Sequence, residues 1–280
     1  MIEQILFQSA HELEKSDIES LTQFACRLAE NAAGEILPYF RQPVSVLNKL
    51  AETNEFDPVT IADQAAETVM RQLIKEHYPQ HGILGEEQGY EAGNCGLTWV
   101  LDPIDGTRAF ITGLPVWGIL IALFDGNKPV IGIMDQPFTG ERYIGNRYKS
   151  VCLHQNKEIM LQTRQCNSLS DAIMMTTSPD MFSTDAEQRV YQELQSNLLM
   201  SRFGGDCYAY CMLARGTVDL VVEADLQAYD IQALIPVVEG AGGVVTNWDG
   251  KPAYAGGQVI AAGTAALHQQ ALEILQSAAR

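Results

Sequence analysis

The sequence predicts a protein of the α/β (α+β) class whose chain forms two lobes. Three observations predict this class: helical periodicity dominates the N-terminal part, antiparallel strand signals follow up to about Gly145, and helices and strands alternate from there to the C-terminus. We expect residues 1–150 to form an α+β lobe and residues 151–280 an α/β lobe. The boundary should fall between Lys149 and Gln165, and both lobes should belong to one domain overall.

The N-terminal part carries two amphipathic helical patterns. Apolar residues recur at helical spacing between Ile18 and Ala32, which predicts a helix that runs to about Tyr39. Ser16 with Glu19 three residues later matches a capping box at its start. A second apolar stripe predicts a helix from about Thr60 that ends before Pro79.

The rest of the chain alternates between apolar strand-like runs and helical patterns. The dipeptide Asp125-Gly126 is typical of a hairpin turn, which makes its two flanking runs antiparallel neighbours. The predicted strands are Ile83–Leu84, Thr98–Leu101, Val116–Phe124, Pro129–Met134, Glu141–Gly145, Val218–Glu223, Val244–Thr246 and Val259–Ala262. The predicted helices are Asp185–Leu199, Asp206–Arg215, Asp230–Gly240 and Ala265–Ala278.

Composition and charge narrow the functional classes. With 46% hydrophobic residues among 280, the chain can build a large core and is not disordered. Its formal charge of −17 argues against a nucleic-acid partner or an anionic membrane surface, since both require basic surface. The N-terminus lacks a signal-peptide pattern, no run is long enough to span a membrane, and the six cysteines form no CxxC pair, so we expect a cytoplasmic protein with reduced thiols.

The densest group of reactive side chains follows the predicted strand at Thr98–Leu101. It places two carboxylates, Asp102 and Asp105, three residues apart and ends in Gly106-Thr107. A turn there leaves backbone N–H groups free to bind an anion, while carboxylates attract metal ions. By itself this pattern predicts a metal and phosphate site or a simple Asp/Gly turn with equal weight.

Other acids stand at similar element ends. Gly85-Glu86-Glu87 follows an apolar run, and adjacent acids repel each other unless a cation is bound. Asp63 lies three residues after Thr60 and could belong to a capping box, and Asp230 could be the N-cap of the helix that follows it. Each of these acids therefore has a structural as well as a functional interpretation.

Taken together and in this order, the segments resemble the inositol monophosphatase family of lithium-sensitive, Mg²⁺-dependent phosphatases. Four elements spread over most of the chain carry the resemblance, so a chance match is excluded in practice. They are Asp57-Pro-Val-Thr60-Ile-Ala-Asp63 for D-x-V-T-x-x-D, Gly85-Glu86-Glu87 for GEE, Trp99 to Phe110 for W-x-x-D-P-I-D-G-T-x-x-F, and Tyr229-Asp230 through Gly243 for W-D-x-x-A…E-x-G-G.

The resemblance implies a layered αβαβα sandwich, usually a homodimer, and a metal-assisted hydrolysis. It implies that two or three Mg²⁺ ions, with Mn²⁺ as a possible substitute, are held by Glu86, Asp102, the carbonyl of Ile104, Asp105 and Asp230. It also assigns Asp63 and Thr107 to the attacking water, Glu86 to a third metal, and the amides of Gly106 and Thr107 to the phosphate. No covalent phosphoenzyme is expected.

One further segment resembles the histidinol-phosphatase branch of this family. Arg202-Phe-Gly-Gly205-Asp206 leads into Cys207-Tyr-Ala-Tyr210, where inositol-specific members have a neutral G-T-A loop. L-Histidinol phosphate carries an ammonium group, which Asp206 and Glu223 could attract, whereas inositol offers no cation to a buried carboxylate. Arg202, Gly205, Asp206 and Glu223 are therefore the expected substrate-binding residues. Alternatively Asp206 caps its helix; Tyr208 and Tyr210 are expected in the core, and Trp117 is left open between core and pocket.

The function predicted from the sequence is thus a Mg²⁺-dependent phosphomonoesterase that acts on a small phosphate ester, with L-histidinol phosphate favoured and histidine biosynthesis as its pathway. Other phosphatase and hydrolase motifs are absent: D-x-D with one intervening residue, Cys-x₅-Arg, a P-loop and G-x-S-x-G. The alternatives are an inositol-1-phosphate or broad-specificity phosphatase, and, in another class, a non-catalytic regulatory protein that keeps the metal pocket.

Overall fold

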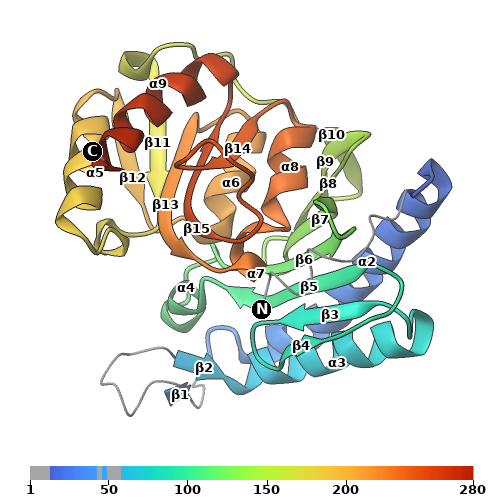
Figure 1. Cartoon of the computed structure of the whole chain (residues 1–280). Coiled ribbons are helices and arrows are strands. Elements are labelled where there is room, and N and C mark those ends of the chain that lie inside the picture. Colours follow the sequence, from blue (N-terminus) through green and yellow to red (C-terminus); the bar gives the residue numbers. More distant parts are fainter. Residues whose placement is uncertain (1–12, 43–45, 49–57, 280) are drawn as a thin grey trace.

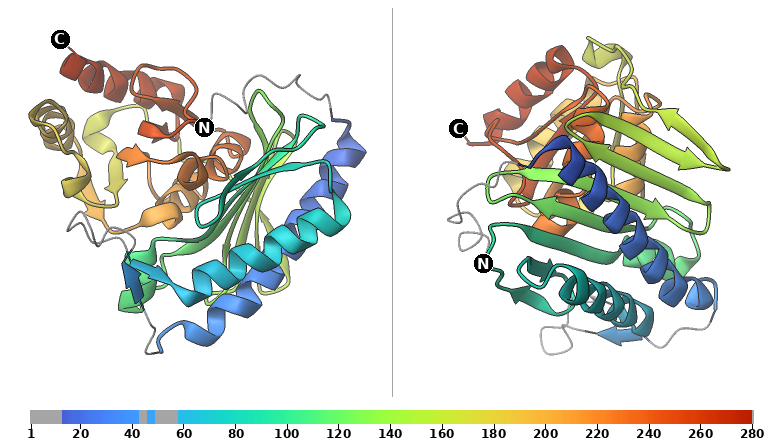
Figure 2. Two further views of the ribbon diagram at one scale, coloured as in Figure 1. Left: turned by 60° about the horizontal axis from the view of Figure 1, so that its bottom comes forward. Right: turned by 90° about the vertical axis from the view of Figure 1, so that its right-hand side faces the viewer.

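Five layers stack in the computed structural model, which describes residues 13–42, 46–48 and 58–279. Helices α2 (Lys15–Ile36) and α3 (Ile61–His77) cover the outer face of an eight-stranded sheet (Figure 1). Helices α6 (Asp206–Ala214) and α8 (Leu234–Gly240) separate that sheet from a five-stranded one, whose outer face carries α5 (Asp185–Ser196) and α9 (Ala265–Leu275) (Figure 2). The α/β (α+β) class and the αβαβα layering predicted from the sequence are therefore confirmed.

The eight-stranded sheet is antiparallel except for one pair. Its order is β10-β9-β8-β7-β6-β5-β3-β4, and β3 and β5 are the parallel neighbours. Asp125 closes the predicted β6–β7 hairpin by accepting hydrogen bonds from the amides of Asn127 and Lys128. The strands are β3 (Gly82–Gly85), β4 (Gly89–Glu91), β5 (Thr98–Asp105), β6 (Gly118–Phe124), β7 (Pro129–Gln136), β8 (Glu141–Asn146), β9 (Lys149–His154) and β10 (Lys157–Met160).

The five-stranded sheet is mixed, in the order β12-β11-β13-β15-β14. Strand β11 runs parallel to both of its neighbours, and the other pairs are antiparallel. The strands are β11 (Ile173–Thr176), β12 (Met200–Phe203), β13 (Leu220–Leu226), β14 (Val244–Asn247) and β15 (Gly257–Ala262). Four further short elements are β1 (Val46–Asn48), β2 (Pro58–Thr60), α4 (Thr107–Thr112) and α7 (Ala228–Ile231).

Two paired glycines let α8 pack directly on the first sheet. Gly132 of β7 and Gly145 of β8 face each other across the strands. A Cβ atom at Gly132 would lie 1.9 Å from the carbonyl oxygen of Ala233, and one at Gly145 would lie 2.2 Å from the amide nitrogen of Val237. The glycines therefore provide the groove in which the α7–α8 segment sits, and they set the separation of the two sheets.

Three differences from the predicted elements stand out. Helix α2 begins with Glu14, whose amide donates to Asp17 at 3.0 Å, so the capping box expected at Ser16 lies two residues too late. The helix expected over Asp230–Gly240 is two short helices, α7 and α8. Strands β9 and β10 extend the first sheet to Met160, past residue 150, and the division into two lobes stays a prediction.

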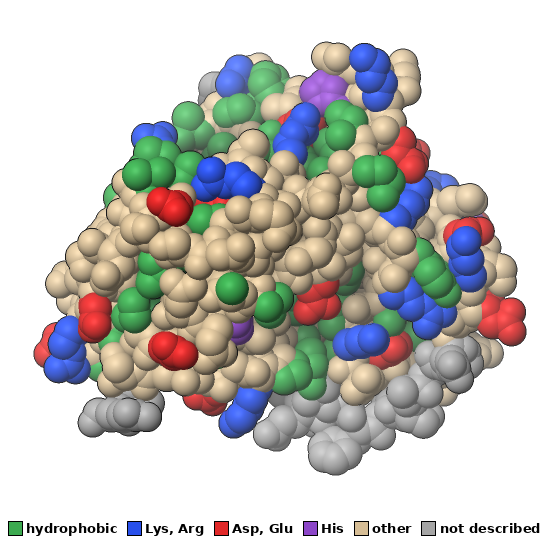
Figure 3. Space-filling view, turned by 90° about the horizontal axis from the view of Figure 1, so that it is seen from above, with side chains coloured by type: hydrophobic (Ala, Val, Ile, Leu, Met, Phe, Trp, Pro, Cys, Tyr) green, Lys and Arg blue, Asp and Glu red, His purple; other side chains and the backbone are tan. Residues whose placement is uncertain are grey.

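The surface carries charges of both signs. Lys, Arg, Asp and Glu side chains are dispersed over the face that Figure 3 presents. None of the helices in the described part of the chain combines the length and the apolar character needed to cross a bilayer. The N-terminal segment that shows no signal-peptide pattern lies largely in residues 1–12, outside the described residues. Asp57 of the first motif also lies outside the described residues.

Candidate active site

A bulge in β5 turns two carboxylates to one side. Asp102 pairs with Leu120 and Asp105 with Gly118, so three steps along β5 match two along β6. In a regular strand residues three apart face opposite sides, and the extra residue cancels this alternation. The bulge contains Pro103, which cannot donate to a ladder. This bulge lies within the strand, before the turn at Gly106, and brings Asp102 and Asp105 to the same side.

The parallel pairing of β3 with β5 brings Glu86 to the same place. Gly85 pairs with Leu101, so the next residues, Glu86 and Asp102, leave the carboxyl ends of neighbouring parallel strands. The amide of Glu86 also donates to the carbonyl of Leu101 at 3.1 Å. Residues 86–88 form the loop between β3 and β4, which explains why an acidic pair occurs directly after an apolar run.

Two helices deliver the remaining acids. Asp63 lies in the first turn of α3 and is buried, and its carboxylate forms a group with those of Glu86 and Asp102. Asp230 lies in α7 and forms a second group with Asp102 and Asp105. Within each group one oxygen per residue lies within 4.8 Å of the others. Asp102 belongs to both groups, so it is the residue that could help to hold a cation at either one.

Asp230 also has a structural role, although it is not the N-cap role that its sequence position suggested. Gln227 is the N-cap of α7, and its amide donates to the Asp230 carboxylate at 2.7 Å. Asp230 is therefore the N3 residue of the capping box, and the expectation that it is the N-cap is wrong. The same bond holds the side chain at the cluster, so the capping role and a ligand role are compatible.

Burial and mutual repulsion make this cluster unfavourable for negative charge alone. Burial, together with Glu86, Asp105 and Asp230, raises the pKa of Asp102 well above its ordinary value. Burial and the neighbouring Asp105 raise the pKa of Asp230 well above its ordinary value. Burial raises the pKa of Asp105 to about 6. Carboxylates in this state are stabilised by divalent cations, and a set of oxygen donors suits hard ions such as Mg²⁺. The residues present therefore fit a metal centre.

The turn after β5 provides the polar groups expected for a phosphate. Gly106 has a φ of 81°, which is unfavourable for other residues, and it precedes α4. The Thr107 hydroxyl donates to the carbonyl of Ile104 at 3.1 Å, and the amide of Ile104 donates to Asp102 at 3.1 Å. This small network fixes the carbonyl of Ile104 and the hydroxyl of Thr107 beside the acidic cluster.

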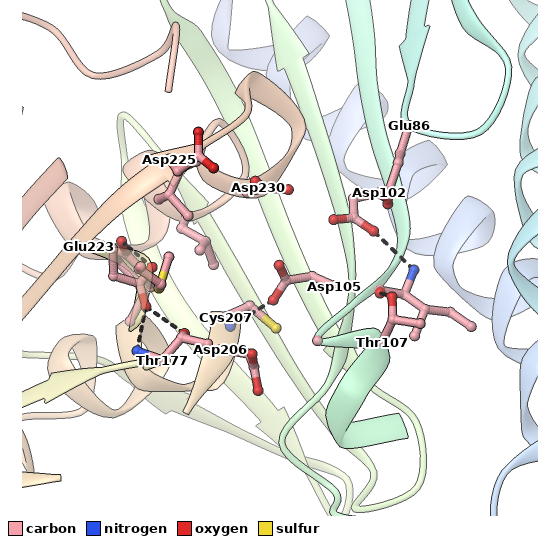
Figure 4. Close-up of a pocket in the computed structure, with 16 residues that line it drawn as sticks. Glu86, Asp102, Asp105, Thr107, Thr177, Asp206, Cys207, Glu223, Asp225 and Asp230 are labelled. Atoms are coloured by element: carbon pink, nitrogen blue, oxygen red, sulfur yellow. Dashed lines mark hydrogen bonds between the residues drawn. The ribbon is translucent and has the colours of Figure 1, made fainter. Parts of the chain in front are cut away.

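The opposite end of the site is built from the second sheet and α6 (Figure 4). Glu223 on β13 is 2% exposed and accepts hydrogen bonds from the amide and hydroxyl of Thr177, at 3.0 and 2.6 Å, and from the hydroxyl of Tyr210 at 3.1 Å. Burial raises the pKa of Glu223 to about 7, and the Thr177 bonds lower it. Tyr210 is in the core as predicted, but it also lines the site.

Asp206 links the two ends. It has a left-handed φ of 43°, and a Cβ atom on Gly106 would lie 3.1 Å from its side chain. The N-cap of α6 is Gly205, and no side-chain capping bond forms there, so the capping alternative for Asp206 is wrong. Burial and the neighbouring Asp105 raise the pKa of Asp206 to about 7. The amide of the next residue, Cys207, donates to Asp105 at 2.7 Å, which anchors the start of α6 on the metal cluster.

A cavity of about 200 Å³ joins these groups, and nine of the twelve residues predicted for the site line it. Those nine are Glu86, Asp102, Ile104, Asp105, Gly106, Thr107, Asp206, Glu223 and Asp230. Asp63 lies behind the lining, against Glu86 and Asp102. Gly205 is buried between Met175 and Ala209, and Arg202 is exposed on β12, so neither lines this cavity and their roles stay predictions.

Sequence analysis missed several residues of the cavity wall. Thr177 directly follows β11, and Asp225 lies two residues after Glu223, with a φ of 62°. Thr177 follows a strand that the sequence did not predict and Asp225 lies within β13, so no local sequence signal marked either residue. The undecided Trp117 is fully buried against Phe40 and Phe110 and is a packing residue.

Known proteins agree with this architecture. The family model described as "Inositol monophosphatase family" matches residues 17–280. The bifunctional phosphatase IMPL2, chloroplastic, of Arabidopsis thaliana is 42% identical over 96% of this chain and 79% of its own length. A histidinol-phosphatase of Chlorobaculum parvum is 32% identical over 84% of this chain and 89% of its own.

A solved inositol monophosphatase from Zymomonas mobilis gives the structural match. It is 39% identical with a TM-score of 0.81, and the match covers 92% of this chain and 98% of that one. The family resemblance of the sequence and the layered fold thus agree with the comparisons. The chain belongs to the inositol monophosphatase family and is a phosphatase of that family.

Proposed function

We propose that this protein is a Mg²⁺-dependent phosphomonoesterase that hydrolyses L-histidinol phosphate to L-histidinol and phosphate. The observation that carries the proposal is the position of Asp206, whose side chain packs against Gly106. One cavity therefore has a metal-binding cluster for the phosphate and two further carboxylates, Asp206 and Glu223, for a cationic group. L-Histidinol phosphate carries charges of both signs, which matches this division.

The residues that would hold the metal are Glu86, Asp102, the carbonyl of Ile104, Asp105 and Asp230. When bound, Mg²⁺ or a substituting Mn²⁺ supplies positive charge that offsets the acids and polarises phosphate oxygens. Because every proposed ligand is an oxygen atom, Mg²⁺ is the ion that this donor set suits best.

The protein's own groups orient the reactants. Asp63, buried behind Glu86 and Asp102, would accept a proton from the attacking water, and the Thr107 hydroxyl would orient that water. The amides of Gly106 and Thr107 would donate to phosphate oxygens at the start of α4. With water as the nucleophile, the reaction needs no covalent phosphoenzyme.

The relatives support two substrates. Histidinol-phosphatases of Chlorobaculum parvum and Mycobacterium tuberculosis, each 32% identical, favour histidinol phosphate. The Zymomonas mobilis inositol monophosphatase, at 39% identity, favours inositol 1-phosphate as the second candidate. Asp206 favours the first, because a polyol gives no compensation for a desolvated carboxylate. A cytoplasmic homodimer acting in histidine biosynthesis is part of the same proposal.

The test is release of inorganic phosphate from three esters: L-histidinol phosphate, inositol 1-phosphate and a nucleoside monophosphate. We expect the highest kcat/KM for L-histidinol phosphate with Mg²⁺ and no turnover with EDTA. A higher kcat/KM for inositol 1-phosphate would replace the proposed substrate by the second candidate. Turnover of none of them would favour the non-catalytic regulatory protein.

A further inference from the structure

Glu67 is a fully buried carboxylate outside the proposed ligand set. It is 0% exposed and lies four residues after Asp63 on the same buried face of α3. A buried ion pair is a poor way to hold a helix on a sheet, because apolar side chains of similar size stabilise such a contact as well or better. The presence of a carboxylate here therefore calls for a partner that needs one.

Those partners are in the loop that carries Glu86. The Glu67 carboxylate accepts hydrogen bonds from the backbone amides of Glu87, at 2.7 Å, and Gln88, at 3.0 Å. It also accepts a hydrogen bond from Nε of Arg71, one turn further along α3, at 2.7 Å. Two consecutive peptide groups are thereby held in one orientation, and the first of them joins Glu86 to Glu87.

The neighbouring contacts leave the loop a single position on α3. A Cβ atom at Gly85 would lie 2.3 Å from Oε1 of Glu67, so the strand can approach this carboxylate only with glycine there. At the other end of the loop, Arg71 donates to the carbonyl of Gly89. The buried pair of Glu67 and Arg71 thus fixes both the residue before the loop, Gly85, and the residue after it, Gly89.

We propose that Glu67 is a positioning residue of the metal site, which fixes the spacing of Asp63 and Glu86 by tying the Glu86 loop to α3. The oxygens of Asp63 and Glu86 lie within 4.8 Å of each other, so a small rotation of the loop changes the distance between them. The inference rests on the proposed metal dependence but not on the identity of the phosphate ester.

The test is calorimetric titration of Mg²⁺ into the phosphate-free protein. In Glu67→Gln the amide group cannot accept all three donors, and loss of such supporting bonds weakens metal binding about tenfold or more. We expect that increase in Kd, with kcat at saturating Mg²⁺ changed by less than about threefold, because the ligands themselves remain. Gly85→Ala should weaken Mg²⁺ binding as well, since the added methyl group displaces the Glu67 carboxylate. If Glu67→Gln does not fold, Gly85→Ala is used in its place.

Asp219→Asn is the matched control. Asp219 is also 0% exposed, accepts Nε of Arg164 at 2.8 Å and the amide of Ile173 at 2.8 Å, and lies in the second sheet. The Asp219→Asn variant should lower the melting temperature about as much as Glu67→Gln does and should leave the Mg²⁺ affinity unchanged. Equal Mg²⁺ affinity in wild type and Glu67→Gln, or an equal loss in Asp219→Asn, would overturn the positioning role alone. A wild type that binds no Mg²⁺ would overturn the proposed function first.

Discussion

The two strands that supply the site, β5 and β13, contain the same irregularity but differ in how their acids are satisfied. β5 has one extra residue between Asp102 and Asp105, and β13 has one between Glu223 and Leu226. Glu223 accepts three hydrogen bonds from Thr177 and Tyr210. The acids that meet at β5 instead repel one another, and burial adds to this cost.

The difference teaches that one half of the cavity is complete and the other half requires cations. Hydrogen bonds from fixed donors offset part of the cost of burying the Glu223 carboxylate without any ligand, although its pKa is still raised to about 7. Asp102 and its neighbours gain the equivalent stabilisation only when positive charge is bound. We therefore attribute catalysis on any phosphate ester to the β5 half and selectivity among esters to the β13 half together with Asp206.

The largest expected effect is that of Asp102→Asn. Asp102 belongs to both acidic groups, so its loss should lower kcat/KM for every ester by roughly a thousandfold or more. The metal-free variant should nevertheless melt at a higher temperature than the metal-free wild type, because a desolvated, repelled charge is removed. Mg²⁺ should raise the melting temperature of the wild type only. A metal-free variant less stable than wild type would contradict the contrast between the two halves.

The second effect concerns selectivity. Asp206→Asn keeps the shape of the side chain and tolerates the left-handed backbone, so it removes the charge alone. We expect kcat/KM for L-histidinol phosphate to fall at least about tenfold, the loss typical of one charged hydrogen bond. Hydrolysis of inositol 1-phosphate under the same conditions serves as the control, and an equal fall for both esters would remove Asp206 from substrate recognition.

A smaller effect is expected from Thr177→Val. The substitution preserves volume and the backbone amide but removes the hydroxyl that donates to Glu223 at 2.6 Å. Glu223 then keeps two of its three donors, so KM for L-histidinol phosphate should rise by about three- to tenfold with little change in kcat. If kcat fell and KM did not change, Thr177 would have to be assigned to the catalytic half.

The smallest effect is the pH dependence of stability in the metal-free protein. Burial raises the pKa of Asp105 to about 6 and the pKa values of Asp206 and Glu223 to about 7, above the ordinary values of 3.8 and 4.5. The folded state therefore binds protons more tightly than the unfolded state, and this stabilisation is lost as pH rises from about 4 to 7. Urea unfolding should show at least about 1 kcal/mol less stability at pH 7.5 than at pH 5.5. Saturating Mg²⁺ should reduce the difference, because Asp105 would hold the metal whereas Asp206 and Glu223 would not. A metal-free protein that gains stability with pH would contradict this account.

Much of the metal half could be predicted from the sequence, because its acids are close together or at strand ends. Asp102 and Asp105 lie three residues apart, and Glu86 follows a strand that pairs with β5. Regular apolar spacing likewise predicted α2 and α3, and the Asp125-Gly126 dipeptide predicted the β6–β7 hairpin. Local patterns suffice where local structure places the side chain.

The substrate half depends on contacts between segments far apart, and these leave little trace in the sequence. Thr177 reaches Glu223 only because β11 and β13 pair in parallel, and the edge strand β12 is too polar to show an apolar run. The split of the Asp230–Gly240 helix has a similar origin, because α8 follows the groove made by Gly132 and Gly145. Asp225 and Thr177 could be recognised only once the two sheets were placed.

The central claim is that the cavity has a preformed half for the cation and a metal-dependent half for phosphate. The most direct measurement is calorimetric titration of L-histidinol and of inorganic phosphate at pH 8, above the pKa of about 7 of Asp206, with and without Mg²⁺. We predict that phosphate binds only with Mg²⁺, whereas L-histidinol binds in both conditions and at least about tenfold more weakly to Asp206→Asn. Phosphate binding without Mg²⁺, or L-histidinol binding that requires Mg²⁺ or ignores Asp206→Asn, would contradict the account.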